Sequence, residues 1–171
     1  MSAPGGLAAT SRTLVAEPLT AAAFAPFGDV IEAAGESFPI NGGICDRFHD
    51  RARMEFTGDG RAGISVGLSR PYALPLSFTL VERHPLGSQA FVPMTGDPFL
   101  VVVAPDEGGR PGTPLAFLTR PGQGVNYLRG VWHGVLTPLG RAAPFLIVDR
   151  VGAGANLEEY RYEACWTVTA A

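Results

Sequence analysis

The sequence predicts an all-β protein, a closed β-barrel or jelly roll of short strands with one or two short helices. Two observations support this fold class. Glycine (22 residues) and proline (15 residues) are spread evenly along the 171-residue chain, so turn signals recur at the spacing that short strands require. Between these turns lie short segments rich in β-branched and aromatic residues, of which residues 99–104 are the most apolar. Closure of such a sheet removes exposed strand edges, which favours a barrel.

The expected elements follow one another without a domain boundary. Residues 1–12 are small and glycine-rich and are expected to form a flexible tail, with residues 13–171 as a single barrel domain. One helix is expected at residues 21–24, capped by Thr20 and ended near Pro26 and Gly28. Strands are expected at residues 29–32, 63–69, 77–83, 89–93, 99–104, 114–118, 124–127, 131–136, 143–149 and 165–168.

Charge and composition narrow the classes of partner. The net charge is −3 and no Lys/Arg cluster stands out, so neither nucleic acid nor an anionic membrane is expected as a partner. The longest apolar runs are too short to span a bilayer, and no signal peptide is expected at the N-terminus. Cys45 and Cys165 have no C-x-x-C spacing and are expected to be ordinary thiols in the cytoplasm, with a single disulfide bridge as the alternative.

Chemistry-bearing side chains gather in the segment ERHPLGSQ, residues 82–89. In a strand, Glu82 and His84 point to the same face, so a carboxylate and an imidazole would enter one cavity. Pro85 and Gly87 then turn the chain, and Gln89 opens the next strand where it can face them. The structural alternatives are a surface ion pair for Glu82, a solvated turn residue at His84 and backbone hydrogen bonding by Gln89.

This spacing resembles the first cupin motif, G-x5-H-x-H-x4-E-x6-G. Glu82 stands at the first His of the motif, His84 at the second and Gln89 at the Glu. Gly96 matches the closing glycine, whereas Leu76 replaces the opening one. The resemblance implies a cupin barrel whose metal-ligand positions are occupied by Glu82, His84 and Gln89.

The second cupin motif, G-x5-P-x-G-x2-H-x3-N, is matched in part further along the chain. Gly122, Gly130 and His133 agree with it, while Leu128 stands in place of the proline and Thr137 in place of the asparagine. In cupins this histidine is the fourth metal ligand, so the resemblance adds His133 to the site. Its structural alternative is a histidine satisfied within the core.

Longer strings narrow the resemblance to one family. INGG, RFHD, ERHPLGSQAFVPM, GVNYLRGVWH and FLIVDR are similar, in order and spacing, to the ureidoglycolate lyase family, from about residue 19 to about residue 152. This resemblance implies an enzyme of allantoin and purine catabolism that cleaves ureidoglycolate to glyoxylate and urea, as a cytoplasmic homodimer. The alternatives are another small-molecule cupin, such as a hydroxy-acid isomerase or an amidohydrolase acting on ureidoglycolate, or a non-catalytic cupin that senses a carboxylate.

The ligand set Glu82, His84, Gln89 and His133 also predicts a type of metal. Two imidazole nitrogens, one carboxylate oxygen and one amide oxygen suit nickel, manganese, iron or zinc better than calcium. With Glu82 as the only anion, a divalent ion would keep roughly one net positive charge, which favours a small anionic substrate. The alternative is a polar cluster without metal, in which Glu82, His84 and His133 are catalytic and Glu82 or His84 accepts the proton.

Six further residues are candidates for substrate binding: Asn41, Arg47, His49, Arg83, Asn126 and Tyr127. Arg47 or Arg83 would hold the substrate carboxylate through a bidentate contact. Arg47 and His49 alternate on a strand and can reach the site from the same subunit or from a neighbouring one. Asn126 or Tyr127 would hydrogen-bond the ureido group or donate a proton. The structural alternatives are a surface charge ladder, a turn in the Asn-Gly-Gly segment and packing of the tyrosine ring.

Overall fold

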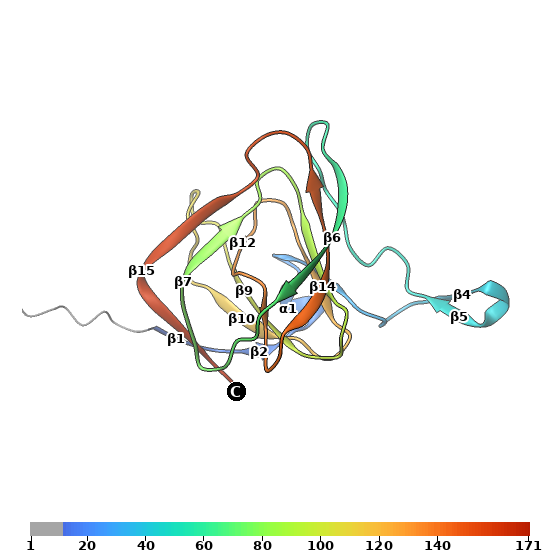
Figure 1. The fold of residues 1–171 in the computed structure, drawn as a ribbon, viewed down its shortest axis with the longest axis horizontal. Helices are drawn as coiled ribbons and strands as arrows, with labels where there is room; N and C mark the ends of the chain where they lie inside the picture. The colour runs from blue at the N-terminus through green and yellow to red at the C-terminus, as the bar shows by residue number, and fades with distance from the viewer. Residues whose placement is uncertain (1–11) are drawn as a thin grey trace, which may run out of the picture.

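The computed structural model describes residues 12–171 as two facing β-sheets with a hairpin projecting from them (Figure 1). The first sheet has eight strands in the order β1-β15-β7-β12-β9-β10-β2, with β13 beside β9. The second has five strands in the order β3-β11-β8-β14-β6, and β4 and β5 form the hairpin. The expected flexible tail lies outside the described residues except for Arg12, which begins β1.

The elements have the following bounds: β1 Arg12–Val15, β2 Glu17–Pro18, α1 Ala21–Phe24, β3 Gly28–Ile31, β4 Phe38–Ile40, the 3-10 turn η1 Asn41–Gly43, β5 Cys45–Arg47, β6 Arg61–Ser69, β7 Leu76–Arg83, β8 Gln89–Pro93, β9 Phe99–Ala104, β10 Leu115–Leu118, β11 Gly124–Tyr127, β12 Trp132–His133, β13 Thr137–Pro138, β14 Ala143–Val151 and β15 Glu158–Thr169. The expected all-β fold of short strands with one short α-helix is therefore confirmed. In the described part of the chain, no helix has the length and apolarity needed to cross a membrane.

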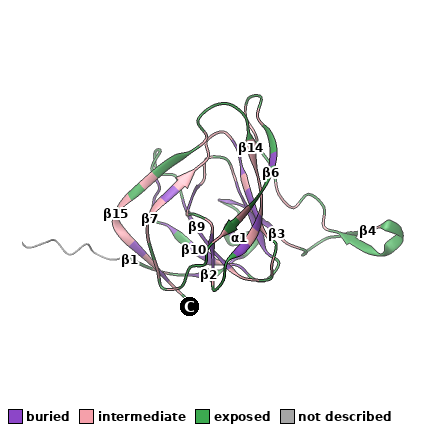
Figure 2. Ribbon diagram, in the orientation of Figure 1, coloured by how far each residue is buried: buried purple, intermediate pink, exposed green. Residues whose placement is uncertain are grey.

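The main core lies between the two sheets (Figure 2). Phe24 of α1 is fully buried, and its ring lies 6.0–6.2 Å from the rings of Phe27, Phe117 and Tyr127. Thr20 caps the helix as predicted, because its side-chain oxygen accepts a hydrogen bond from the backbone N–H of Ala23 at 3.2 Å. Helix α1 thus places the ring of Phe24 in the core between the sheets. That ring contacts Tyr127 and helps to position it in the site described below.

Strand β9 is buried along its whole length, which explains its continuous apolar sequence. Phe99, Val101 and Val103 face the main core. Leu100 and Val102 face the other side of the sheet, where a second apolar cluster covers them. A strand buried on both faces needs no polar alternation.

The strand predictions differ from the structure in three ways. Residues 131–136 were expected to form one strand, but β12 ends at His133 and pairing with β9 resumes only at Thr137 of β13. Between these pairs, residues 134–136 stand opposite only two residues of β9, so the ladder is interrupted, although the N–H of Gly134 still donates to the carbonyl of Val102 at 2.9 Å. Strand β15 begins at Glu158 and not at residue 165. Its first half is polar and partly exposed, so it lacks the apolar pattern from which the strand was predicted. Strand β5 contains Arg47 but ends before His49, although both were expected to alternate on one strand, and strands β1, β2, β4 and β13 were not predicted. They are short and owe their strand geometry to pairing with distant segments.

Candidate functional site

Strands β7 and β12 bring three predicted site residues together inside the barrel. Glu82 pairs directly with His133 across the two strands, and His84 follows on the same face of β7. One ligand atom from each of the three side chains lies within 4.8 Å of the others. The carboxylate Oε1 of Glu82 lies 3.9 Å from Nε2 of His84, and the two imidazole rings are 5.3 Å apart.

Backbone carbonyls determine which nitrogen of each histidine is free. Nδ1 of His84 lies 2.6 Å from the carbonyl oxygen of Asn156, and Nδ1 of His133 lies 2.9 Å from that of Gly134. A carbonyl oxygen only accepts hydrogen bonds, so each Nδ1 carries the hydrogen, and each Nε2 in the neutral ring offers a lone pair. Both Nε2 atoms are buried and have no hydrogen-bond partner among the described residues.

Gln89 faces the same interior and is oriented by a carboxylate. It pairs across strands with Tyr127, whose ring stacks on that of His133 at 4.2 Å and 3°. Its Nε2 donates to Oδ2 of Asp149 at 3.3 Å, which leaves its Oε1 buried and without a partner in the described chain. Asp149 is a site residue that sequence reasoning missed. The charge count given above is corrected accordingly, because Glu82 is not the only anion near the cluster.

Burial adjusts the proton affinities at the site. Desolvation raises the pKa of Glu82; the adjacent His84 lowers it, and the negative charge of Glu159 adds to the increase. Desolvation also lowers the pKa of His133 to about 3, partly offset by its bond to the Gly134 carbonyl. His133 is therefore neutral near pH 7, with Nε2 available as an acceptor.

Tyr127 is the proton-bearing group next to these acceptors. Complete burial raises the pKa of its phenol, and the negative charge of Glu82 raises it further. The hydroxyl therefore stays protonated at neutral pH and can donate a hydrogen bond. The structure places Tyr127, a candidate from the sequence, beside the cluster, and its ring also packs in the core as the structural alternative expected.

The four acceptors fit a divalent transition metal. Ligand atoms of Glu82, His84 and His133 lie within 4.8 Å of one another, and Gln89 stands opposite Tyr127, whose ring stacks on that of His133. The two imidazole Nε2 atoms and Oε1 of Gln89 are buried and lack any hydrogen-bond donor among the described residues. Buried acceptors are normally paired, because an unpaired one retains its desolvation cost. A cation bound among Glu82, His84 and His133 would satisfy both Nε2 atoms, and with Oε1 of Gln89 the set of two nitrogens and two oxygens is one that nickel, manganese, iron and zinc accept.

Arg83 lies on the opposite face of β7 from Glu82 and His84. Its Nε donates to Oε2 of Glu158 at 2.6 Å and its Nη1 to Oδ1 of Asp106 at 2.8 Å. The guanidinium also stacks on Trp132 at 4.4 Å. Strand alternation accounts for this position, and the structure does not bring Arg83 to the cluster.

Asn126 is separated from the cluster in the same way, because it alternates with Tyr127 along β11. Its Nδ2 donates to Oδ2 of Asp29 at 3.0 Å and to the carbonyl of Arg53 at 3.1 Å. Asn126 is fully buried, but its side chain lies on the face of the second sheet opposite to that of Tyr127. Its role in the described chain is to hold the segment around Arg53.

Asn41, Arg47 and His49 belong to the projecting hairpin and the residues that follow it. All three are exposed, and the ring of His49 contacts Phe38 within the same segment at 5.9 Å. Strands β4 and β5 pack mainly against each other and against η1. Within one subunit, therefore, these candidates are not assembled with Glu82, His84 and His133.

Replacing Arg83 by alanine tests its outward position. We expect kcat/KM to be unchanged and the free energy of unfolding to fall by about 1 kcal/mol, since half-exposed ion pairs and a cation–π contact each contribute little. Steady-state kinetics and urea denaturation measure both quantities. A large increase in KM would instead show that Arg83 binds the substrate.

Comparisons with known proteins place the chain among close relatives. A family model described as "Ureidoglycolate lyase" matches residues 11–169. A ureidoglycolate lyase of Chelativorans sp. (strain BNC1) is 63% identical over 87% of this chain and 92% of its own. "Ureidoglycolate lyase 2" of Rhizobium meliloti (strain 1021) is 58% identical over 88% of this chain and 94% of its own. A ureidoglycolate lyase of Rhodobacter capsulatus is 57% identical over 86% of this chain and 92% of its own.

Proposed function

This chain belongs to the ureidoglycolate lyase family, and on that premise we propose that it cleaves ureidoglycolate to glyoxylate and urea at the cluster of Glu82, His84 and His133. The observation that carries the proposal is the convergence of these three side chains in the barrel, with their ligand atoms within 4.8 Å of one another. They lie beside a buried phenol and a glutamine amide oxygen. Such a site can accept a proton and can also hold a polar substrate.

The proposed reaction moves one proton and breaks one carbon–nitrogen bond. Ureidoglycolate carries a hydroxyl and a ureido nitrogen on the same carbon, next to a carboxylate. Glu82 takes the hydroxyl proton, the oxygen forms the aldehyde of glyoxylate, and the bonding electrons leave with the nitrogen of urea. Protonated Glu82 then returns the proton to that nitrogen, so the balance is closed. In the cluster without metal, the raised pKa of Glu82 suits both transfers, because an acid–base group works best when its pKa approaches the working pH.

Two other side chains would position the substrate in this scheme. The protonated phenol of Tyr127 donates to the ureido oxygen, which favours the departing urea. Asp149 holds Gln89 through its Nε2, so the Gln89 oxygen stays directed into the site. The Glu82 carboxylate has two oxygens, so one can be a ligand while the other exchanges the proton.

A divalent metal belongs to the proposal, with Glu82, His84, Gln89 and His133 as its ligands. When bound, such an ion would lower the pKa of the substrate hydroxyl and stabilise the oxygen as its charge develops. The presence of Asp149 besides Glu82 lowers the net charge of the site to about zero by simple counting, so the ion alone would not retain an anionic substrate.

Product analysis tests the reaction. With ureidoglycolate as substrate we expect urea and glyoxylate in equal amounts and no ammonia. Ammonia and carbon dioxide would instead indicate an amidohydrolase. If no product forms at all, yet a small carboxylate raises the melting temperature, the chain is a sensor and the proposed activity is wrong.

Metal binding has its own readout, which does not depend on activity. Protein treated with a chelator should gain about 2.7 kcal/mol of unfolding free energy when nickel or manganese is added at 100 times its Kd. His133→Ala should lose this gain, whereas His49→Ala should keep it, because His49 is exposed and outside the cluster. Equal stabilisation of both variants would place the metal elsewhere.

The proposed setting is a cytoplasmic homodimer. Cys45 and Cys165 are both free thiols, which supports a reducing compartment. The exposed apolar side chains of β6, considered next, support association of two copies.

A further inference from the structure

The hairpin of β4, η1 and β5, called the arm from here on, extends away from the barrel (Figures 1 and 2). Its tip turns through Asn41, Gly42 and Gly43, all with positive φ. Its apolar side chains face solvent: Ile44 is 88% exposed and Phe38 45%. An isolated two-stranded hairpin is marginally stable in water, so an arm of this kind needs a surface to pack against.

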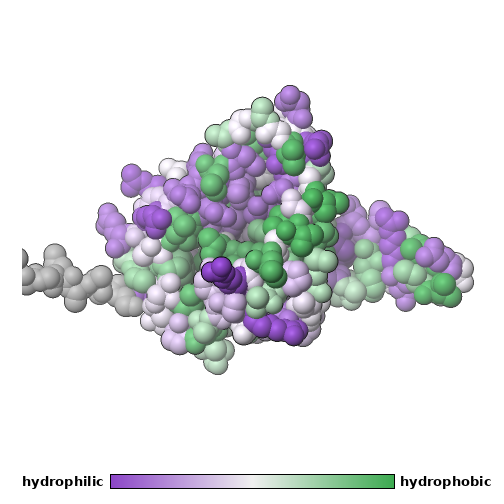
Figure 3. All heavy atoms as spheres, viewed as in Figure 1, coloured by the Kyte–Doolittle hydropathy of each residue, from purple (hydrophilic) through white to green (hydrophobic). Residues whose placement is uncertain are grey.

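A second unpartnered surface lies on β6, the edge strand of the second sheet. Ile64, Val66 and Leu68 alternate outward and are 73%, 63% and 74% exposed. Leu146 and Val148 of β14 stand directly opposite Val66 and Ile64 and extend the same patch. These five residues form what we call the outer face, and Figure 3 shows hydrophobic side chains gathered over β6. The exposed side of an antiparallel sheet is normally polar, so this face is suited to a protein partner.

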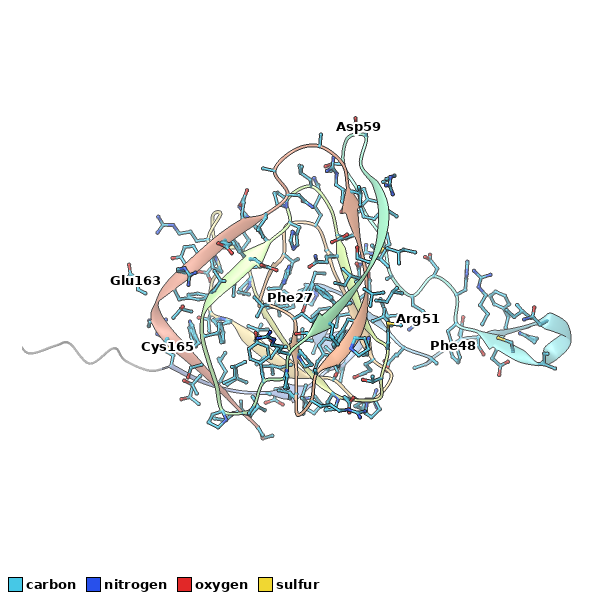
Figure 4. All side chains as sticks on the ribbon, in the orientation of Figure 1. Phe27, Phe48, Arg51, Asp59, Glu163 and Cys165 are labelled. Atoms are coloured by element: carbon cyan, nitrogen blue, oxygen red, sulfur yellow. The ribbon has the colours of Figure 1, made fainter. Side chains whose placement is uncertain are left out.

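Open space surrounds the base of the arm. Three crevices with volumes of about 520, 250 and 320 Å³ share Arg51 in their linings. Figure 4 labels Arg51 and Phe48 between the barrel and the arm. Nε of Arg51 is buried and has no partner among the described residues. The largest crevice is lined by the arm and by the second sheet together, so it offers room and a donor to another chain.

Within residues 12–171, the cluster of Glu82, His84 and His133 includes no arginine that could hold the substrate carboxylate. Glu82 and Asp149 supply two negative charges, and Arg83 is paired with carboxylates on the opposite face of β7. The backbone of Arg47 pairs with that of Phe38 within the arm, but its exposed guanidinium forms no ion pair or hydrogen bond with the described part of the chain. Its charge therefore complements the anionic barrel interior, and a guanidinium is the group that binds a carboxylate in bidentate fashion.

We propose that the active site is shared: a second copy of this chain packs on the outer face, and its arm brings Arg47 to the neighbouring barrel to hold the substrate carboxylate. The outer face borders the site, because Gly63 of β6 pairs with Asp149, which contacts Gln89. A segment of a second copy that lies along β6 would therefore come close to Asp149 and Gln89 at the edge of the cluster. The arrangement is reciprocal in a two-fold dimer, so each subunit donates one arm and receives one. The identity of the ligand rests on the proposed function.

Complementation between two defective subunits tests the proposal. Arg47→Ala should lower kcat/KM about 10- to 150-fold, the effect of losing a charge-assisted contact, and His133→Ala should abolish turnover. Heterodimers of the two, isolated by a different tag on each subunit, contain one intact site if the arm acts on the partner. They should then show about half of the wild-type activity. Heterodimers no more active than the Arg47→Ala homodimer would overturn the proposal.

Sedimentation separates this proposal from the proposed reaction. Val66→Asp on the outer face and Ile44→Asp on the arm should each convert dimers to monomers, while Leu115→Asp, at a similarly apolar exposed position on the first sheet, should leave the dimer intact. A wild-type dimer that follows this pattern but yields no urea refutes the reaction and not the interface. A wild-type monomer that produces urea refutes the shared site.

Discussion

Replacing Glu82 by glutamine lowers kcat/KM for ureidoglycolate by about 10²- to 10⁴-fold, the range expected when a general base is removed. Glutamine has nearly the same shape as glutamate but cannot take the hydroxyl proton. In the structure, Glu82 is paired across strands with His133 and lies 3.9 Å from His84, so no other described carboxylate occupies an equivalent position. Steady-state kinetics with urea detection measures the loss.

Glu163→Gln is the matched control for this prediction. Glu163 is an exposed residue of β15 that points away from the barrel (Figure 4), and the same carboxylate-to-amide change there should leave kcat/KM unaltered. Circular dichroism and urea denaturation check that both variants stay folded. Similar activity in the two variants would exclude Glu82 as the group that moves the proton.

Replacing Phe24 by alanine lowers the free energy of unfolding by about 3–5 kcal/mol, since a large buried ring leaves a cavity when truncated. Phe24 is fully buried and packs on Phe27, Phe117 and Tyr127. Tyr127 in turn stacks on His133, so the loss of support extends into the site and should lower kcat as well. Urea denaturation at constant pH measures the change in stability.

Two further substitutions serve as controls for the loss of stability expected in Phe24→Ala. Phe24→Leu retains most of the apolar volume and should cost clearly less than Phe24→Ala. Leu157→Ala removes an apolar side chain that is 52% exposed and should change the stability by at most about 0.5 kcal/mol. If Phe24→Ala cost no more than Leu157→Ala, the helix would not be part of the core.

Sequence patterns predicted the central strands because those strands have strong local signals. Strand β9 is apolar throughout and β8 lies between two turn signals, and both were expected with the bounds that the structure has. The first half of β15 and the strands of the arm have no such pattern. Their conformation depends on hydrogen bonding to a distant partner, which local composition does not encode.

The positions of Arg83 and Asn126 show which side-chain directions can be predicted from strand alternation. The period of two that brings Glu82 and His84 to one face also sends Arg83 to the other, and the same rule separates Asn126 from Tyr127. Both outcomes could have been predicted from the sequence. The contact between Gln89 and Asp149 could not, because the two residues are 60 positions apart and meet only through the register of β8 and β14.

The sequence by itself determined the fold class, the family and the residue types of the cluster, since these follow from local periodicity, turn signals and motif spacing. Only the tertiary structure decided which side chains meet. The pairing of β7 with β12 brings Glu82 to His133, and that of β8 with β14 adds Asp149 to the site. The arm, with Arg47 on it, is held away from the barrel of its own subunit. Strand register and chain direction are properties of the whole sheet, and they determine which of these side chains come close together.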